Sequence, residues 1–157
     1  MTGPIEVREA TTADSAAVAK LHDHAWGGPI VVGHGVTYDL TTLPTLVGVG
    51  DAVEGVLTYQ LDGDSLEVVS IVASQPGRGV GSALLTAAKR RTPARLWLIT
   101  TNDNLDALRF YQRNGLRIVG VAVGAVDRAR ERKPTIPLVG AYGIALHDER
   151  TLEWIRP

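Results

Sequence analysis

Three glycines, Gly77, Gly79 and Gly81, stand between a β-branched run and a helical pattern. The run at residues 68–72 is typical of a buried strand, and the apolar spacing from Val80 onward follows the period of a helix. Glycine has no Cβ, so the backbone N–H groups of such a turn can converge on a ligand. The helix that follows adds unpaired N–H groups and the positive end of its dipole. The pattern predicts a site for a phosphate-bearing ligand at residues 77–82.

Other phosphate-binding loops do not match this turn. A mononucleotide loop carries Gly-Lys-Ser/Thr, and no lysine precedes Ser82. The dinucleotide fingerprint G-x-G-x-x-G needs its third glycine one residue later than Gly81. Arg78 lies inside the turn and could add a cation to a phosphate site. A turn that binds nothing stays the alternative for this stretch alone, because glycine-rich turns are common before helices.

A second motif lies further along the chain. Residues 104–116 have the form N-x-x-A-x-x-F-Y-x-x-x-G-L. Together with the turn G-R-G-V-G, this motif resembles the GNAT superfamily of CoA-dependent N-acyltransferases, and the close match covers residues 66–119. One position departs from the family pattern, because Pro76 stands where the family usually has Arg or Gln, with Gln75 beside it.

The resemblance implies acetyl-CoA (or CoA) as the co-substrate and no metal. In the family the fourth and fifth strands splay apart, and the pantetheine arm of CoA fills the gap between them. In this chain the two strands would be residues 66–73 and 95–101. The expected CoA contacts lie on the fourth strand, in the turn and around the second motif: Ile71, Val72, Ala73, Gln75, Gly77, Arg78, Gly79, Val80, Gly81, Ser82, Asn102, Asn104, Phe110 and Tyr111. Helix capping is a second, compatible role for the asparagines.

Acyl transfer from a thioester to an amine needs a base for the amine proton, donors for the developing oxyanion and an acid for the leaving thiolate. By resemblance Tyr111 is the expected catalytic acid, since a phenol with an ordinary pKa of about 10 is protonated at neutral pH. Glu67 is the candidate base, and backbone N–H groups at residues 71–73 are the expected oxyanion donors. The alternatives are a core tyrosine and a surface glutamate, and the next candidate bases are Glu54 and Asp39.

The acceptor would lie against residues 26–38 and 126–142, the variable walls of the fold. Residues 27–44 are rich in glycine and show no strong periodicity. They predict a loop that covers the substrate, with a short helix, or a plain loop. The candidate substrate contacts on these walls are aromatic or polar: Trp26, His34, Tyr38 and Tyr142.

The composition indicates an ordinary globular protein. The chain has 157 residues, of which 45% are hydrophobic and 21% charged, as expected of a single domain over residues 1–157. A net charge of −1 gives no general attraction to nucleic acid or to an anionic membrane. No apolar run approaches the ~20 residues of a membrane span, and the first residues lack a signal-peptide pattern, so the expected location is cytoplasmic. The chain has no cysteine, and its four histidines show no metal-ligand spacing.

Periodicity and turn residues predict the order of the elements. Strands are expected at residues 5–9, 45–49, 53–61, 66–73, 95–101, 116–123 and 142–147, and helices at 14–26, 82–90, 104–114 and 126–133. The expected fold is a GNAT-like mixed α/β sheet of about seven strands flanked by helices. Its N-terminal half is antiparallel, and its parallel centre splays between the fourth and fifth strands.

The leading hypothesis is an N-acetyltransferase that acts on the primary amine of a small molecule. Two alternatives stay open: a non-catalytic module that binds acyl-CoA and regulates a partner, and an acetyltransferase of protein lysines or N-terminal amines. An open cleft would favour a protein substrate, and a covered pocket would count against it. No nucleic-acid or membrane partner is expected, and a homodimer is compatible with the sequence.

Overall fold

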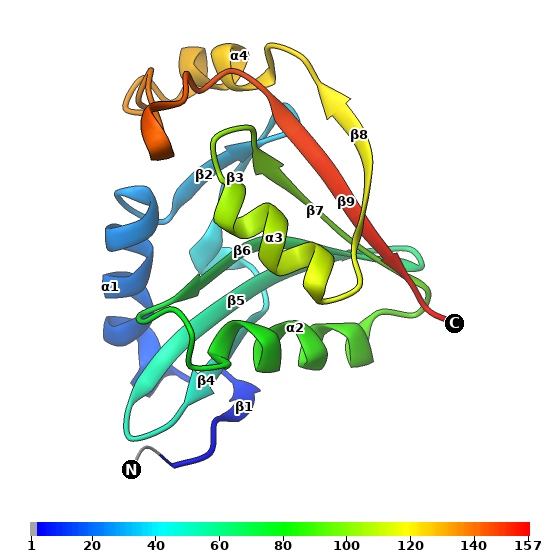
Figure 1. Ribbon diagram of the computed structural model, residues 1–157. Helices are drawn as coiled ribbons and strands as arrows, with labels where there is room; N and C mark the ends of the chain where they lie inside the picture. The colour runs from blue at the N-terminus through cyan, green and yellow to red at the C-terminus, as the bar shows by residue number, and fades with distance from the viewer. Residues whose placement is uncertain (1–2) are drawn as a thin grey trace.

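The computed structural model describes residues 3–157 as a seven-stranded sheet with helices on both faces (Figure 1). The strands lie in the order β1-β4-β5-β6-β7-β9-β8. All neighbours are antiparallel except β6 and β7, which are parallel. The expected mixed α/β sheet is confirmed, and its parallel centre consists of this one pair. Met1 and Thr2, which belong to the expected domain and to the segment without a signal-peptide pattern, lie outside the described residues.

The elements follow one another along the chain as β1 (Glu6–Glu9), α1 (Ser15–Trp26), β2 (Ile30–Gly33), β3 (Val36–Asp39), β4 (Thr45–Val49), β5 (Val53–Asp62), β6 (Ser65–Ala73), α2 (Val80–Arg91), β7 (Arg95–Thr101), α3 (Leu105–Arg113), β8 (Arg117–Ala122), α4 (Ala125–Arg132) and β9 (Glu149–Ile155). Short 3-10 helices lie at Thr12–Asp14, Leu40–Thr42 and Ala141–Gly143. None of the helices within residues 3–157 is long and apolar enough to cross a bilayer.

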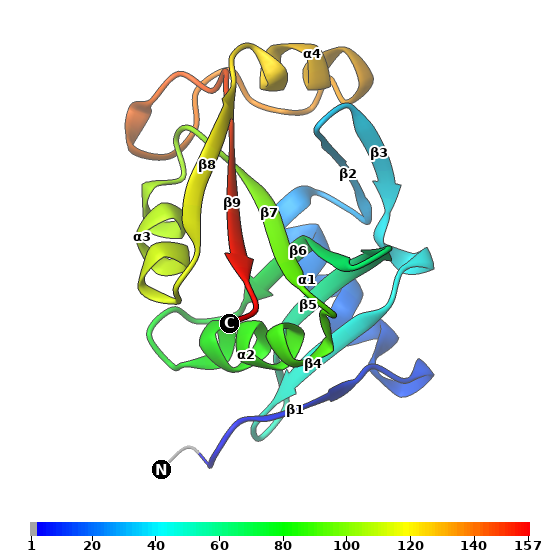
Figure 2. The ribbon, with the colours of Figure 1, turned by 90° about the vertical axis from the view of Figure 1, so that its right-hand side faces the viewer.

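The two faces of the sheet carry different layers. Helices α2 and α3 cover one face, and α1 and the β2–β3 pair cover the other (Figure 2). Leucines that are almost completely buried join α2 to five strands: Leu46, Leu57, Leu66, Leu84, Leu85, Leu96, Leu98 and Leu152. Burying a leucine side chain stabilises a fold by about 1.5–3 kcal/mol, so this layer is a rigid support for the strands above it.

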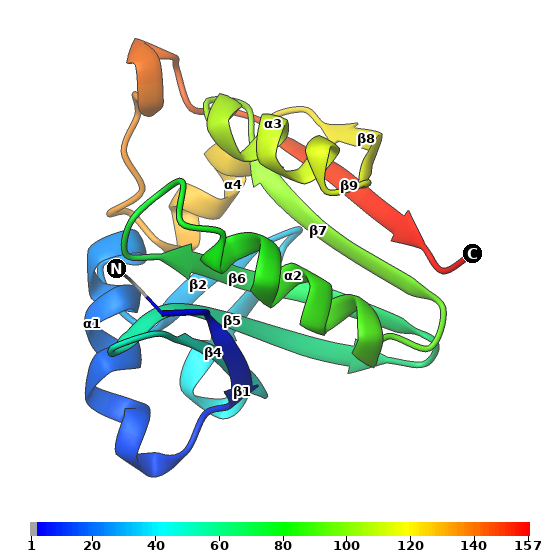
Figure 3. The same ribbon diagram turned by 60° about the horizontal axis from the view of Figure 1, so that its bottom comes forward.

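The gap between β6 and β7 is built into the strand pairing. The two strands pair only at Ser65–Arg95, Leu66–Leu96 and Glu67–Trp97 and then separate, as Figure 3 shows. Between β5 and β6 the register shifts at Thr58 and Tyr59, and such a bulge bends a strand. The expected splay is therefore present, and it opens just beyond Glu67.

Residues 27–44 contain a β-hairpin followed by the short 3-10 helix Leu40–Thr42, where the sequence predicted a loop with or without a short helix. β2 and β3 are antiparallel, with Gly33 opposite Val36, so the turn consists of His34 and Gly35. Both residues have a positive φ, 39° and 80°. Positive φ at both central positions gives the two-residue turn whose twist matches that of the flanking strands.

The last strand is β9, and the prediction of a strand at residues 142–147 is wrong. Tyr142 lies in the left-handed region, with φ 59°, inside a 3-10 turn. A single isolated bridge joins Val139 to Ala145. β9 is inserted between β7 and β8 and pairs with both. Its sequence, E-R-T-L-E-W-I, is rich in charge, which hides the strand from a hydrophobic pattern.

Candidate active site

A cleft of about 1540 Å³ opens where β6 and β7 separate. We name its two sides by the elements that form them. The turn side consists of residues 75–82 with Asn104, Ala107, Phe110 and Tyr111. The hairpin side consists of Trp26, residues 31–33, Tyr38, Glu67, Ile99, Val126, Ala129, Lys133, residues 135–137, Leu146 and Glu149.

The turn side presents backbone groups at the start of α2. Gly77 and Gly79 have φ values of 81° and 79°, a conformation that side-chain-bearing residues rarely adopt. A Cβ built on either glycine would meet no atom within 4 Å, so there is open space in front of the turn. The first N–H groups of a helix have no partner within it and favour an anion. The turn therefore suits the pyrophosphate of CoA.

Arg78 lines the cleft, but its guanidinium is already paired. It lies 2.9 Å from Glu54 Oε1, on β5. The pair partly neutralises the cation that the sequence suggested for a phosphate. Both alternative bases thus have partners already. Glu54 is paired with Arg78, and Asp39 accepts hydrogen bonds from the backbone N–H and the hydroxyl of Thr41.

Helix α3 brings Tyr111 to the turn side. Asn104 caps this helix by accepting a hydrogen bond from the N–H of Ala107 at 3.1 Å, and it also lines the cleft. Phe110 packs against the start of α2, where a Cβ on Gly81 would lie 3.0 Å from its ring. The Tyr111 side chain is 7% exposed and lines the cleft, and its hydroxyl makes no hydrogen bond to another residue within 3–157. Burial raises the pKa of Tyr111, so the hydroxyl stays protonated and remains a free donor at the cleft.

Glu67 is the centre of a hydrogen-bonded cluster on the hairpin side. Its Oε2 accepts a hydrogen bond from the Tyr38 hydroxyl at 2.7 Å, and its Oε1 lies 2.7 Å from Nε2 of His34. His34 Nε2 also lies 2.9 Å from the Tyr38 oxygen. Burial, followed by the bond to Glu67, raises the pKa of Tyr38. The hairpin thus supplies both side chains that orient the carboxylate.

A second carboxylate, Glu149, holds the turn of the hairpin from β9. Its Oε1 and Oε2 lie 3.1 and 3.4 Å from the backbone N of His34, which donates to them. The His34 ring packs against Trp97, with centroids 5.1 Å apart. Glu149 is 4% exposed, and burial raises the pKa of its carboxyl. Glu67 and Glu149 therefore approach the same histidine from two different strands.

Helix α4 fastens the hairpin over the cleft. Lys133 Nζ donates to the carbonyl of Trp26 at 2.7 Å and to that of Ile30 at 2.8 Å. Arg132 donates to the carbonyl of Gly35 in the turn. In Figure 2, α4 reaches from the top of β8 to the hairpin. The hairpin side is therefore walled by α4 as well as by the hairpin.

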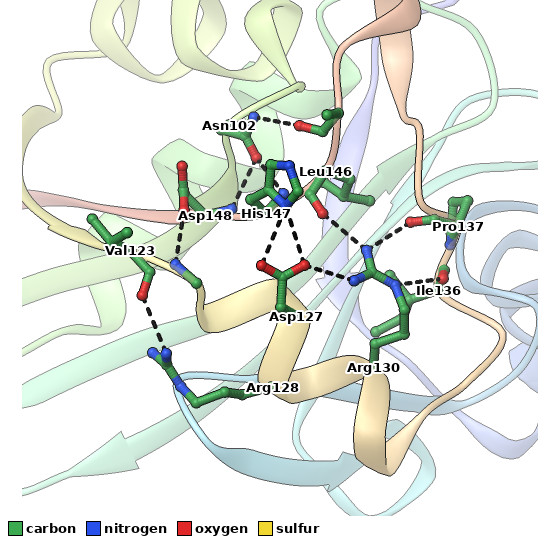
Figure 4. Close-up of polar contacts among 12 residues, drawn as sticks. Asn102, Val123, Asp127, Arg128, Arg130, Ile136, Pro137, Leu146, His147 and Asp148 are labelled. Carbon is green, nitrogen blue, oxygen red and sulfur yellow. Dashed lines mark hydrogen bonds and ion pairs between the residues drawn. The ribbon is translucent and has the colours of Figure 1, made fainter.

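The segment 134–148, which we call the strap, also lines the hairpin side of the cleft. Arg130 donates to the carbonyls of Ile136, Pro137 and Leu146 at 2.9–3.1 Å, and these three residues line the cleft (Figure 4). Asp127 lies 2.9 Å from Arg130 and 3.1 Å from His147. One guanidinium thus joins both arms of the strap to α4.

The structure brings most of the predicted residues to the cleft and leaves four away from its wall. Asn102 is used by the strap, since its Oδ1 accepts from the N–H groups of His147 and Asp148 and its Nδ2 donates to Ala145. Tyr142 is exposed and donates to Asp106 at 2.6 Å. Val72 is buried in the sheet. His34 reaches the site through Glu67 and Tyr38.

Sequence reasoning missed Glu149, Lys133 and Arg130. Their contacts reach 115, 107 and 16 residues along the chain, so no local spacing indicates them. The hairpin was detectable, because His34-Gly35 separates two β-branched runs and glycine favours positive φ. Within residues 3–157 no group of three or more His, Asp or Glu side chains is placed to hold a metal ion.

Comparisons with known proteins agree with this geometry. A family model described as the acetyltransferase (GNAT) family matches residues 18–116. The uncharacterised protein YdhI of Bacillus subtilis is 36% identical over 130 residues, which is 79% of this chain and 81% of YdhI.

Solved structures share the fold at lower identity. An IAA acetyltransferase from Bacillus cereus superimposes with a TM-score of 0.73 at 19% identity, over 97% of this chain and 99% of that one. A GNAT family acetyltransferase from Elizabethkingia anophelis with acetyl-CoA bound gives 0.68 at 18% identity, over 97% and 98% of the chains.

Proposed function

The chain belongs to the GNAT family of acetyltransferases, and from this premise we propose that it transfers an acetyl group from acetyl-CoA to the primary amine of a small molecule. The observation that carries the proposal is one continuous cleft with a phosphate-type turn at one side and a covered, carboxylate-bearing pocket at the other. Acetyl-CoA, when bound, supplies an activated thioester to this cleft. The remaining chemistry belongs to the side chains and backbone of the chain.

The turn side is the proposed binding site for acetyl-CoA. The free N–H groups at the start of α2 would hold the pyrophosphate, and the open edges of β6 and β7 beyond Glu67 would hold the pantetheine arm. A related fold has been solved with acetyl-CoA bound, which supports this assignment. The backbone N–H groups of residues 71–73 are the proposed donors to the reacting carbonyl.

Tyr111 is the proposed acid. Its hydroxyl is protonated and has no partner within the described part of the chain, so it is available to donate to the leaving sulfur. Within residues 3–157 the fully buried side-chain polar atoms without a partner are His22 Nε2 and Arg78 Nε, so the Tyr111 hydroxyl is open to the cleft that it lines. A donor that is kept free at a cleft is consistent with a role that only a ligand completes.

Glu67 is the proposed base for the amine. The carboxylate lines the cleft near the point where β6 and β7 separate. Tyr38 and His34 fix its orientation through one contact to each oxygen. Each oxygen of a carboxylate has two lone pairs, so one contact leaves each oxygen able to bind an amine N–H. Tyr38 and His34 are thus positioning residues for Glu67.

A small molecule suits this site better than a protein. The hairpin, α4 and the strap cover the hairpin side, and their bonds to one another hold the cover in place. An extended peptide would need an open groove on that side. Apolar walls at Val31, Ile99 and Leu146 indicate an acceptor with an apolar body beside its amine.

The proposal is tested by a panel of amines with acetyl-CoA, in which release of free thiol is followed. We expect turnover with small primary amines and little with lysine-containing peptides. Replacing Glu67 with Gln keeps its shape and its acceptor oxygen and should lower kcat/KM for the amine by about 10²–10⁴-fold, as loss of a general base does. Tight binding of acetyl-CoA without turnover on any amine would instead identify a non-catalytic acyl-CoA-binding module.

A further inference from the structure

We propose that Glu149 binds a second cationic group of the acceptor. The substrate is therefore a primary amine joined by an apolar chain to a second cation, such as the second ammonium group of a diamine. The inference rests on the proposed function, because it assigns the substrate class of the same cleft. It concerns binding and specificity, and it leaves the transfer step unchanged.

The first argument is that Glu149 lacks a cation. It is 4% exposed and lines the cleft, yet it forms no ion pair within residues 3–157. Its one hydrogen-bond donor is the backbone N–H of His34, which both oxygens share. A carboxylate can accept about four hydrogen bonds, so most of its capacity is unused. Buried charges in proteins are normally paired, and the open partner position here faces a ligand cleft.

Other buried carboxylates of the chain are better satisfied. Asp14 is paired with Arg8 at 2.7 Å. Asp103 accepts from the N–H of Ala141 and from the hydroxyl of Thr101. Glu67 has Tyr38 and His34. Glu149 differs from these because the protein itself provides a single donor, and burial accordingly raises the pKa of its carboxyl.

The cationic side chains near Glu149 already donate hydrogen bonds to backbone carbonyls. Lys133 donates to Trp26 and Ile30, Arg132 to Gly35, and Arg128 to Val123 at 3.2 Å. These contacts hold the hairpin and α4 in place. Arg128 and His34 lie close enough to Glu149 to lower the pKa of its carboxyl, which acts against the effect of burial. Neither side chain forms an ion pair with Glu149 within residues 3–157, so the position beside the carboxylate stays open to a ligand cation.

The second argument is the spacing of the two carboxylates. Glu67 pairs with Trp97 on β7, and Glu149 pairs with Thr101 on the other edge of the same strand. Four positions along a strand correspond to roughly 13 Å, and strands on the two edges of β7 are roughly 10 Å apart, so the two backbones are about 16 Å apart. Both side chains reach toward His34, so the carboxylates lie closer than their backbones do.

Apolar surface lies between the two carboxylates. Val31, Val32 and Ile99 line this part of the cleft, and Gly33 lets the hairpin approach Ile99, which would lie 2.7 Å from an added Cβ. An alkyl chain suits such a wall, with the reacting amine at Glu67 and the second cation at Glu149. A monoamine of the same length would leave Glu149 without its partner.

The test compares diamines with monoamines of equal chain length. Putrescine, cadaverine and hexamethylenediamine are paired with butylamine, pentylamine and hexylamine, and kcat/KM is measured for each with acetyl-CoA. We expect the best diamine to exceed its monoamine by about 10-fold or more, the size of a hydrogen bond to a charged group.

Glu149→Gln separates charge from structure. The amide oxygen of Gln can still accept the N–H of His34, so the hairpin keeps its anchor while the negative charge is lost. We expect the ratio of diamine to monoamine kcat/KM to fall by about 10-fold. Glu153→Gln is the matched control, on the same strand but paired with Arg95 at 2.6 Å and away from the cleft wall, and it should keep the parent ratio.

The outcomes of these experiments distinguish the role of Glu149 from the proposed acetyltransferase function. Turnover of monoamines and diamines at equal rates, or an unchanged ratio in Glu149→Gln, overturns the role of Glu149 and leaves the acetyltransferase standing. Failure to bind acetyl-CoA, measured by calorimetry, overturns the proposed function itself. A diamine should also raise the Tm of the CoA complex more than its monoamine does, and the absence of this difference would overturn the inference without any need for turnover.

Discussion

The two sides of the cleft are built from different kinds of contact. The turn side is made of residues close in sequence, and its binding groups are backbone N–H groups at the start of α2. The hairpin side is made of side chains from α4, β6 and β9 that meet the hairpin across long stretches of chain. In the proposed function the turn side binds CoA, the co-substrate that members of a CoA-dependent family share. The hairpin side can change its ligand through single side chains, because its contacts are side-chain contacts.

Because of this difference, substitutions on the two sides of the cleft should change different measured properties of the protein. Substitutions on the turn side should change the affinity for acetyl-CoA or the transfer step. Substitutions on the hairpin side, apart from those at the proposed base Glu67, should change the KM and the identity of the amine.

Tyr111→Phe removes the free hydroxyl from the turn side. We expect kcat to fall by about 10²–10⁴-fold, the usual contribution of a general acid, while the Kd of acetyl-CoA changes little. Tyr142→Phe is the control, because this tyrosine is exposed, does not line the cleft and donates its hydroxyl to Asp106. An unchanged kcat in Tyr111→Phe, with chemistry rate-limiting, would remove Tyr111 from the mechanism.

Gly79→Asp tests whether the turn binds the pyrophosphate. It adds a negative charge where like charges would meet, which costs several kcal/mol, and the Kd of CoA should rise by about 10²–10³-fold. Gly63→Asp is a matched control, because Gly63 also has a positive φ and open space around it but lies in the β5–β6 turn. If both variants fold and bind CoA equally well, the phosphate site lies elsewhere.

Arg130→Met tests the strap on the hairpin side. It removes three bonds to strap carbonyls, and the KM for the amine should rise by about 10-fold with little change in the Kd of CoA, since hydrogen bonds to charged groups are among the stronger ones. Arg91→Met, on α2, loses one bond to Ala87 within its own helix, lies away from the cleft wall and should behave like the parent. Equal losses for amine and CoA would contradict the division into two sides.

Glu149→Gln should also change the pH dependence of stability. Burial raises the pKa of Glu149 above the ordinary 4.5, so the folded state holds this proton more tightly than the unfolded state does. The parent therefore loses stability as pH rises from about 4.5 through the raised value, and the neutral Gln does not. Without ligand the variant should melt higher than the parent at pH 8, with the gain shrinking toward pH 4. A gain that does not depend on pH would contradict this reading.

The same division explains what the sequence predicts. The turn at residues 77–82 and the helix from Asn104 are local patterns, because a glycine conformation and a cap depend on neighbouring residues. The splay was expected from the resemblance and is present in the pairing of β6 and β7. The strand β9 was missed because its sequence is rich in charged residues and does not show the hydrophobic alternation of a strand. It is a strand because it pairs with β7 and β8, which are distant in sequence.

The acceptor pocket could be predicted only in part. Tyr38 and Glu67 were candidates, but their mutual contact depends on the hairpin, which brings Tyr38 across 29 positions of sequence. Glu149 carried no local signal at all. Its position at the cleft follows from the pairing of β9 with β7, which puts Glu149 opposite Thr101. Such a placement is decided by tertiary packing, which periodicity does not report.

The insertion of β9 between β7 and β8 sets an order for folding. β8 emerges from the ribosome before β9 but has no neighbour in the sheet until β9 has paired with β7. Until then β7 keeps an open edge, and such edges make folding intermediates prone to aggregation. Glu149 begins β9, so the strand that closes the sheet also carries the second carboxylate to the cleft. The acceptor pocket is therefore assembled in the same late step that completes the sheet, and a chain that has not finished folding has no complete acceptor pocket.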